Sequence, residues 1–338
     1  MRLRRLGNSG LEVSPICLGA LMFGHQSTDA EGARMLTLAR DRGVNFLDTA
    51  NTYGLGQSED ALGRLIRPAD RRQWIIASKT GMLWNDKPNR SGVSRKWILE
   101  SIDASLERLK TDYVDVYYIH RDDPTVPLEE PMRAMADIVR QGKARYIGLS
   151  NFAGWRIAEA VAACDRLGVP RPTVCQPYYN AANRMAEIEI IPACVHYGMG
   201  IVPYSPLSRG VLTGKYGRRT TPTAHLKARA KYSQVIRSDF RPESLALAET
   251  VGVHAAKRGQ STIDFAVNWV LANRFVTSVL AGPRTAAQLK DYLDAAEKPF
   301  TAEDEALVDG LVPAGAPSSH NWIDPVLPAT GRGLRDSA

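Results

Sequence analysis

Short apolar or β-branched runs alternate with longer segments of helical period along most of the chain, and this alternation restricts the fold more than any other feature. Strands separated by helices pair in parallel, because each helix returns the chain to the same end of the sheet. The predicted strands cover residues 13–18, 44–48, 74–79, 114–120, 145–149, 174–176, 200–204 and 276–280. Repeated units of one strand and one helix predict an α/β protein with a (β/α)8 barrel.

Helix boundaries fit between these strands. Thr28 and Glu31 have the spacing of a capping box, and Ser94 is expected to cap the helix before the fourth strand. Three glycines stand where helices are expected to end, namely Gly43, Gly142 and Gly168.

The spacing lengthens after the seventh strand. It leaves room for a long basic loop at 215–241 and for two helices near 243–257 and 262–272. We expect one barrel over residues 1–312, followed by a tail at 313–338 that is rich in proline, glycine and polar residues. A doubly wound sheet is the rival fold, but its glycine-rich turn should follow the first strand, and the best candidate, Gly54 with Gly56, follows the second.

Composition narrows the classes of partner. The net charge of +7 suits an anionic ligand, but the basic loop lacks the regular aromatic spacing of a base-stacking surface, so nucleic acid is not expected. There is no apolar run long enough to span a membrane and no export signal, so we expect a soluble, cytoplasmic protein. The cysteines lack a disulfide or metal pattern and are expected to be buried thiols: Cys17, Cys164, Cys175 and Cys194.

Polar residues stand at the carboxyl ends of three consecutive predicted strands, where barrels of this kind carry their functional groups. Asp48 ends the second strand, Lys79 the third and His120 the fourth, and Tyr53 lies in the loop after the second strand. Each residue alone has an ordinary explanation, such as a turn cap or a packed ring. Together, at corresponding strand ends, they predict a functional cluster.

The cluster suggests proton donation by the Tyr53 phenol. An ordinary tyrosine has a pKa of about 10, and a neighbouring ammonium stabilises phenolate, so Lys79 is expected to lower the pKa of Tyr53 towards neutrality. Asp48 is expected to keep Lys79 charged and oriented. His120 is expected to donate to the substrate oxygen or to complete the relay.

Long segments of the chain resemble, in order, motifs of the aldo-keto reductase superfamily. They are RLGNSGLEVSPICLGALMFG, FLDTANTYGLGQSE, SKTG, LERLKTDYVDVYYIHRDD, GKARYIGLSNF, PYSPLSRGVLTGKY and AGPRTAAQL. The similarity is greatest to the branch that holds bacterial reductases and potassium-channel β subunits. It implies an NADP-dependent oxidoreductase that binds NADPH without a Rossmann fold and reversibly reduces aldehydes and ketones to alcohols. It also implies a catalytic tetrad of Asp48, Tyr53, Lys79 and His120.

The resemblance assigns cofactor contacts as well. Ser150, Asn151 and Gln176 are expected to hold the nicotinamide carboxamide, and Tyr204 is expected to stack on its ring. The remaining expected contacts lie at the first strand end, along the pyrophosphate loop and at the adenosine end: Gly19, Ser205, Pro206, Leu207, Ser208, Arg209, Gly210, Lys215, Gly282, Arg284, Gln288 and Asp291. Thr285 and Gln288 also have capping-box spacing, so this stretch is in addition a predicted helix start.

A small carbonyl or alcohol substrate is expected at an apolar mouth formed by Phe23 and Trp84 with Tyr53 and His120. The alternative function is a β-subunit-like protein that senses nicotinamide redox state with little turnover. A metal hydrolase is disfavoured because the histidines are scattered, so no metal is expected. Tyr292 stands where relatives usually have asparagine, which leaves one adenine contact open, and homo-oligomer formation also stays open.

Overall fold

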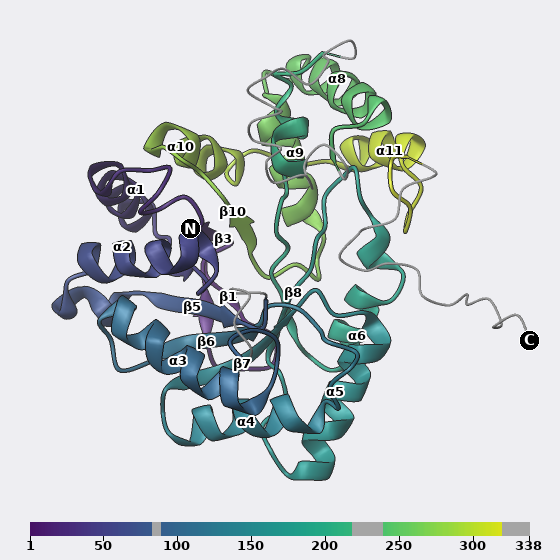
Figure 1. The fold of residues 1–338 in the computed structure, drawn as a ribbon. Helices are drawn as coiled ribbons and strands as arrows, with labels where there is room; N and C mark the ends of the chain where they lie inside the picture. Colours follow the sequence, from purple (N-terminus) through teal and green to yellow (C-terminus); the bar gives the residue numbers. More distant parts are fainter. Residues whose placement is uncertain (83–88, 218–238, 320–338) are drawn as a thin grey trace, which may run out of the picture.

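Eight parallel strands pair in the order β10-β3-β4-β5-β6-β7-β8-β9 (Figure 1). The computed structural model describes residues 1–82, 89–217 and 239–319. The barrel strands are β3 (Ile16–Gly19), β4 (Phe46–Asp48), β5 (Ile75–Thr80), β6 (Val114–Ile119), β7 (Ala144–Ser150), β8 (Val174–Gln176), β9 (Gly200–Ile201) and β10 (Val279–Ala281). A parallel bridge between Tyr204 and Leu280 joins the two ends of the sheet. The predicted (β/α)8 barrel is therefore confirmed.

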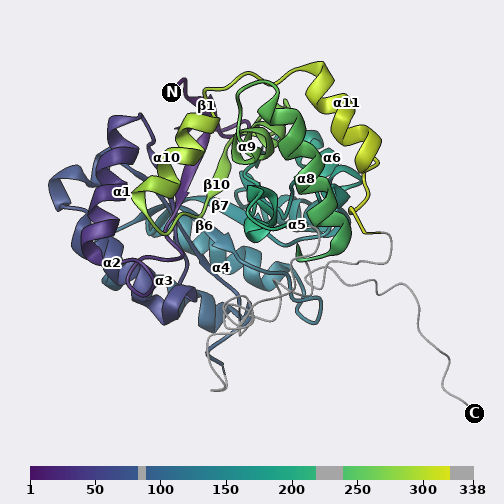
Figure 2. The ribbon, with the colours of Figure 1, turned by 90° about the horizontal axis from the view of Figure 1, so that it is seen from above.

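Helices surround the strands (Figure 2). They are α1 (Asp29–Asp41), α2 (Gln57–Leu65), α3 (Arg95–Leu109), α4 (Glu129–Arg140), α5 (Gly154–Leu167), α6 (Ile190–His196), α8 (Pro242–Ala256), α9 (Thr262–Ala272), α10 (Ala286–Ala295) and α11 (Ala302–Leu311). Short 3-10 turns add η1 (Tyr53–Gly56), η2 (Pro68–Gln73), η3 (Met185–Glu187) and η4 (Ser208–Thr213). The two helices predicted after the basic loop are α8 and α9.

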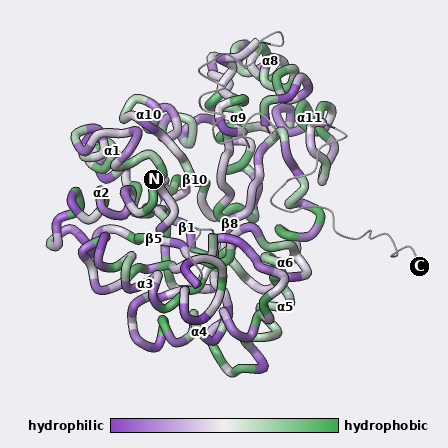
Figure 3. The backbone as a smooth tube through the Cα atoms, viewed as in Figure 1, coloured by the Kyte–Doolittle hydropathy of each residue, from purple (hydrophilic) through white to green (hydrophobic). Residues whose placement is uncertain are grey.

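Hydrophobic side chains form a core on each face of the barrel wall. The larger core lies between strands and helices, and hydrophobic and hydrophilic stretches alternate along helices such as α3 and α4 (Figure 3). The smaller core contains Cys17, Phe46, Val116 and Tyr118 from neighbouring strands. All four cysteines are buried, as expected.

The first predicted strand, 13–18, is in fact two elements. β2 (Glu12–Val13) pairs antiparallel with β1 (Arg4–Arg5), and β3 begins only at Ile16. Pro15 separates them because proline has no backbone N–H to donate to a ladder. Leu6 and Val13 of this hairpin are fully buried against the smaller core, so the hairpin covers part of it.

The helix caps predicted from the sequence are found in the structure, with one exception. Ser94 accepts a hydrogen bond from the Trp97 N–H, and Gly43, Gly142 and Gly168 have positive φ at helix ends. Thr28 accepts from the Glu31 N–H, but the Glu31 carboxylate does not return to Thr28. It accepts instead from the backbone of α10 and from Arg34, so the predicted capping box is only half formed.

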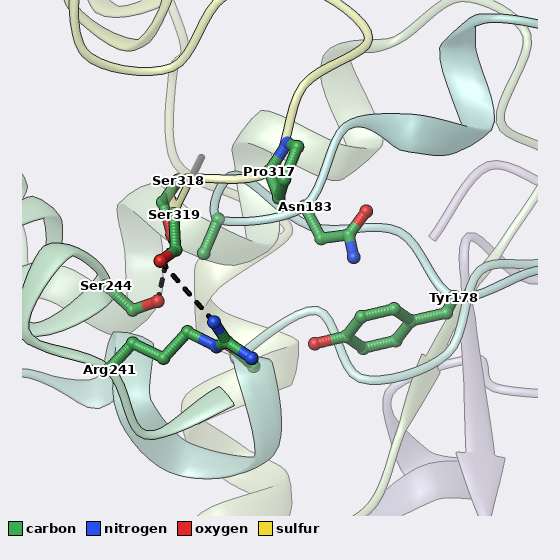
Figure 4. A pocket seen from close by; sticks show the side chains of 9 residues that line it. Tyr178, Asn183, Arg241, Ser244, Pro317, Ser318 and Ser319 are labelled. Atoms are coloured by element: carbon green, nitrogen blue, oxygen red, sulfur yellow. Dashed lines mark hydrogen bonds between the residues drawn. The ribbon is translucent and has the colours of Figure 1, made fainter. Parts of the chain in front are cut away.

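Residues 313–319 of the predicted tail are bonded to the loop after β8. Ala316 accepts from the Arg184 N–H at 3.0 Å, and Ser318 donates to the Ala182 carbonyl at 2.9 Å. Figure 4 shows Pro317 beside Asn183, with Ser318 and Ser319 against the start of α8. Residues 218–238 of the basic loop and 320–338 of the tail lie outside the described residues. In the part of the chain that is described, we find no helix with the length and hydropathy of a membrane span.

Two helical glycines give a test of packing. A Cβ added at Gly63 in α2 would lie 2.1 Å from the Arg108 carbonyl oxygen of α3, whereas one added at Gly310 in α11 would meet nothing within 4 Å. Alanine is the better helix former at both positions. We nevertheless expect Gly63→Ala to lower the free energy of unfolding by about 1–3 kcal/mol, because backbone cannot yield as a side chain can.

The matched variant Gly310→Ala should leave the free energy of unfolding unchanged or raise it by up to about 1 kcal/mol. Urea unfolding of both variants measures the difference. Equal effects of the two substitutions would show that α2 and α3 can separate without cost.

Candidate active site

Strand register brings the polar strand ends together. Asp48 of β4 pairs with Ala77 of β5, and Lys79 follows two residues later, on the same face of β5. The His120 N–H extends the β6 ladder by donating to the Thr80 carbonyl. Tyr53 begins η1, where its N–H donates to the Ala50 carbonyl at 3.1 Å.

The Lys79 ammonium makes three hydrogen bonds in a site with no solvent access. It donates to the Asp48 carboxylate, to the Thr49 carbonyl oxygen at 2.9 Å and to the Tyr53 hydroxyl oxygen at 3.1 Å. The side chains of Lys79 and Asp48 are both 0% exposed. All three ammonium donors are therefore used, and one of them is directed at the phenol.

Charges and burial determine the protonation states. Burial opposes the charge on Lys79, but the attraction of Asp48 and Tyr53 outweighs it and raises the pKa of Lys79. The expected lowering of the Tyr53 pKa is not found. Burial raises the pKa of Tyr53 more than Lys79 lowers it, and Asp48 adds to the rise. The phenol is thus protonated at neutral pH, because burial disfavours the charged phenolate more than the Lys79 ammonium stabilises it.

His120 faces Tyr53 edge to face, with ring centroids 5.8 Å apart. Burial and the Lys79 charge hold the pKa of His120 well below its usual value, so the imidazole is neutral. Its Nδ1 atom is buried without a hydrogen-bond partner among the described residues. The Asn151 amide donates to the His120 carbonyl at 2.8 Å and so fixes the backbone at this strand end.

The residues expected to hold the nicotinamide lie beside this cluster and bond to one another. Ser150 donates to the Gln176 carbonyl at 2.9 Å, and Tyr204 donates its hydroxyl to the Asn151 amide oxygen at 2.8 Å. The Gln176 amide donates to Asp48 at 2.9 Å. This last contact was not predicted, although both residues end strands of the barrel, and it connects the two expected groups directly.

The expected pyrophosphate loop has an unusual backbone. Ser205, Ser208 and Arg209 all have positive φ, between 46° and 59°, which non-glycine residues rarely adopt. Pro206 and Leu207 are buried between them, Gly210 has a φ of 99°, and a Cβ on Gly210 would lie 3.5 Å from the Lys215 ammonium.

One buried acid supports this loop and was not predicted as a site residue. Asp239 accepts a hydrogen bond from the Ser208 hydroxyl at 2.8 Å and pairs with the Arg209 guanidinium at 3.2 Å. The Tyr178 hydroxyl also donates to it, and Figure 4 shows Tyr178 pointing towards the start of α8. The signal was available in the sequence, since Asp239 is the single acidic residue of the basic stretch 215–241.

The expected adenosine residues lie at the start of α10. The Arg284 N–H donates to the Gln288 side chain at 2.9 Å, and Asp291 lies one turn further along the helix. Tyr292 is buried and bonds to the Gly282 backbone. At the first strand end, a Cβ on Gly19 would lie 2.8 Å from the Ala281 carbonyl oxygen, so close strand packing requires this glycine.

The expected substrate residues fare differently. Phe23 is 0% exposed and packs in the larger core against Gly32 of α1. Trp84 lies outside the described residues. Across residues 1–82, 89–217 and 239–319, no group of three or more histidine, cysteine or acidic side chains could hold a metal ion.

Comparison with known proteins agrees with this architecture. Residues 15–313 match the model of the aldo/keto reductase family. A probable voltage-gated potassium channel β subunit of Arabidopsis thaliana is 37% identical over 300 residues, which cover 88% of this chain and 92% of the relative. An uncharacterized oxidoreductase of Bacillus subtilis is 32% identical over 330 residues, covering 94% and 98%.

An L-glyceraldehyde 3-phosphate reductase of Escherichia coli O157:H7 is 33% identical over 324 residues, which cover 93% of each chain. These matches extend over nearly the whole barrel, strand ends included. Together with the fold and the side chains gathered at its mouth, they show that this chain belongs to the aldo/keto reductase family.

Proposed function

We propose that the protein is an oxidoreductase that reduces aldehydes or ketones to alcohols with NADPH, reversibly, and that Tyr53 supplies the proton. The observation that carries this proposal is the Lys79 ammonium, which is fully buried and bonded at once to Asp48 and to the Tyr53 hydroxyl. Relatives named as an oxidoreductase and as a reductase support the reaction class.

The residues present suit a dinucleotide. Ser205, Ser208, Arg209 and Gly210 all have positive φ, and turns that contain left-handed residues form backbone concavities that bind anions such as phosphate. Arg209 and Lys215 add positive charge to the same loop. Ser150, Asn151 and Gln176 would hold the carboxamide, with Tyr204 against the ring.

The mechanism follows from the cluster. NADPH would supply hydride to the carbonyl carbon of the substrate. The protonated Tyr53 hydroxyl would donate to the carbonyl oxygen as negative charge develops there. Lys79, 3.1 Å from that hydroxyl, would stabilise the phenolate left behind. The neutral His120 has one ring N–H, which would orient the substrate oxygen by a hydrogen bond.

The alternative is a nicotinamide-sensing protein with little turnover, as one relative is named as a channel β subunit. The assembled side chains of Tyr53, Lys79 and His120 favour the enzyme, because a cofactor sensor needs no proton donor. Turnover of a carbonyl panel by the purified protein, followed by NADPH absorbance, separates the two.

Tyr53→Phe should lower kcat for carbonyl reduction by about two to four orders of magnitude, as loss of a positioned acid does. NADPH binding, followed by fluorescence, should stay nearly intact because the ring remains. Tyr113→Phe is a matched control, since Tyr113 stacks on Arg71 and Arg145 away from the site. Residual turnover above about a tenth of the parent value would assign the proton to another residue.

The pH dependence of reduction should be flat from about pH 6 to pH 9. Burial raises the pKa of Tyr53, and reduction needs its protonated form, so the rate should fall only when the pH rises through a value above 10. The lowered pKa of His120 keeps that ring neutral throughout. Measuring kcat under saturating conditions tests this. A loss of activity between pH 7 and pH 8 would require an acidified donor.

Arg284→Ala should weaken NADPH binding far more than NADH binding, because a guanidinium meets a 2′-phosphate with charge-assisted hydrogen bonds worth roughly 1.5–3 kcal/mol. Arg274→Ala serves as the control, since Arg274 is exposed and precedes β10 at the opposite end of the barrel. Titrations of both variants with both cofactors measure the effect. Equal weakening of NADPH and NADH by Arg284→Ala would indicate a structural role.

A further inference from the structure

A carboxylate from α1 occupies the N-terminus of α10, the helix that begins at the proposed adenosine end. Glu31 accepts a hydrogen bond from the N–H of Ala286, the first residue of α10, at 2.5 Å. The Glu31 side chain is only 16% exposed. A helix N-terminus carries partial positive charge and free N–H groups, so it is the natural position for a phosphate. Here the chain places its own anion at that position.

Other donors at this helix start are also engaged. The Gln288 N–H donates to the Thr285 hydroxyl at 3.3 Å, and the Arg284 N–H donates to the Gln288 side chain at 2.9 Å. Of the amides of Ala286, Ala287 and Gln288, only that of Ala287 donates to no side chain of the described residues. A phosphate at this place would therefore share the helix end with the Glu31 carboxylate.

The carboxylate is held where it stands. The Ser27 hydroxyl donates to the Arg284 carbonyl at 2.7 Å, and Arg42 pairs with Asp294 at 3.0 Å, so both ends of α1 are tied to α10. The Ala286 N–H and then Arg34 lower the pKa of Glu31, so it is ionised at neutral pH. Arg34 pairs with Glu31 while its own side chain is 65% exposed.

We propose that Glu31 is a specificity-determining residue that limits the preference for a 2′-phosphorylated nicotinamide cofactor over the unphosphorylated one. This inference rests on the proposed function, which places the 2′-phosphate near Arg284. The Arg284 guanidinium attracts that phosphate. The Glu31 carboxylate, which is bonded to the N–H of Ala286 two residues after Arg284, repels it. An unphosphorylated ribose carries no charge there and is indifferent to Glu31.

The test replaces Glu31 by glutamine, which keeps an acceptor for the Ala286 N–H and removes the charge. We expect the affinity for 2′,5′-ADP, measured by calorimetry, to rise at least about threefold, while that for ADP stays within about twofold. The gain should shrink in about 1 M salt, because salt at that concentration screens interactions between exposed charges. NADPH and NADH titrations should show the same change in ratio.

Asp29→Asn is the matched control, because Asp29 lies in the first turn of α1 and its exposed carboxylate pairs with Arg64 at 2.8 Å. It should leave the ratio of the two affinities unchanged. A second variant, Arg34→Gln, leaves Glu31 without its cation and should shift the ratio the opposite way. Because Arg34 is exposed, this variant tests the idea even if Glu31→Gln unfolds.

Equal changes in both affinities on Glu31→Gln, or no change in their ratio, would overturn the inference alone. Failure of the parent protein to bind either 2′,5′-ADP or NADPH would overturn the proposed function together with it. Thermal unfolding without ligand distinguishes a loss of folded protein from either result.

Discussion

The arrangement of the barrel mouth depends on the hydrogen bonds of one buried group, the Lys79 ammonium. Removing a single charge from water costs several kcal/mol even after relaxation, so Lys79 must be satisfied by groups from elsewhere in the chain. Asp48, the Thr49 carbonyl and the Tyr53 hydroxyl provide those partners, and Gln176 secures Asp48 from the other side. Strands β4, β5 and β8 and the loop that carries Tyr53 are thereby joined at one point.

A parallel barrel makes this convergence possible. Every strand ends at the same rim, so single residues far apart in the chain meet without long loops. The groups proposed for catalysis lie at strand ends, where their placement is rigid, whereas those proposed to bind the longer cofactor lie in η4 and at the start of α10. The loop at η4 has an unfavourable backbone conformation, and the buried Asp239 carboxylate stabilises it through Ser208 and Arg209.

Local patterns predicted the elements well, and longer-range competition explains the failures. The barrel strands, α8, α9 and the Ser94 cap follow from periodicity and capping rules. The partner of Glu31 was predicted wrongly because the capping-box rule takes account of one helix only. The Glu31 carboxylate instead accepts a hydrogen bond from the backbone of α10. The Tyr53 pKa was misjudged because burial and Asp48 act together against Lys79.

The barrel can close only after the last strand, β10, has been synthesised. β3 forms its ladder with β10, so Ile16 cannot pair until Val279 has been synthesised. The bridge from Asn183 likewise cannot form before Pro317 has been synthesised. While the chain emerges from the ribosome, the growing sheet has two unpaired edges, and such edges are templates for wrong partners. Pairing β3 with β10 joins residues at nearly opposite ends of the chain, which makes closure slow. Chaperone dependence would thus be concentrated in the interval before β10 leaves the exit tunnel.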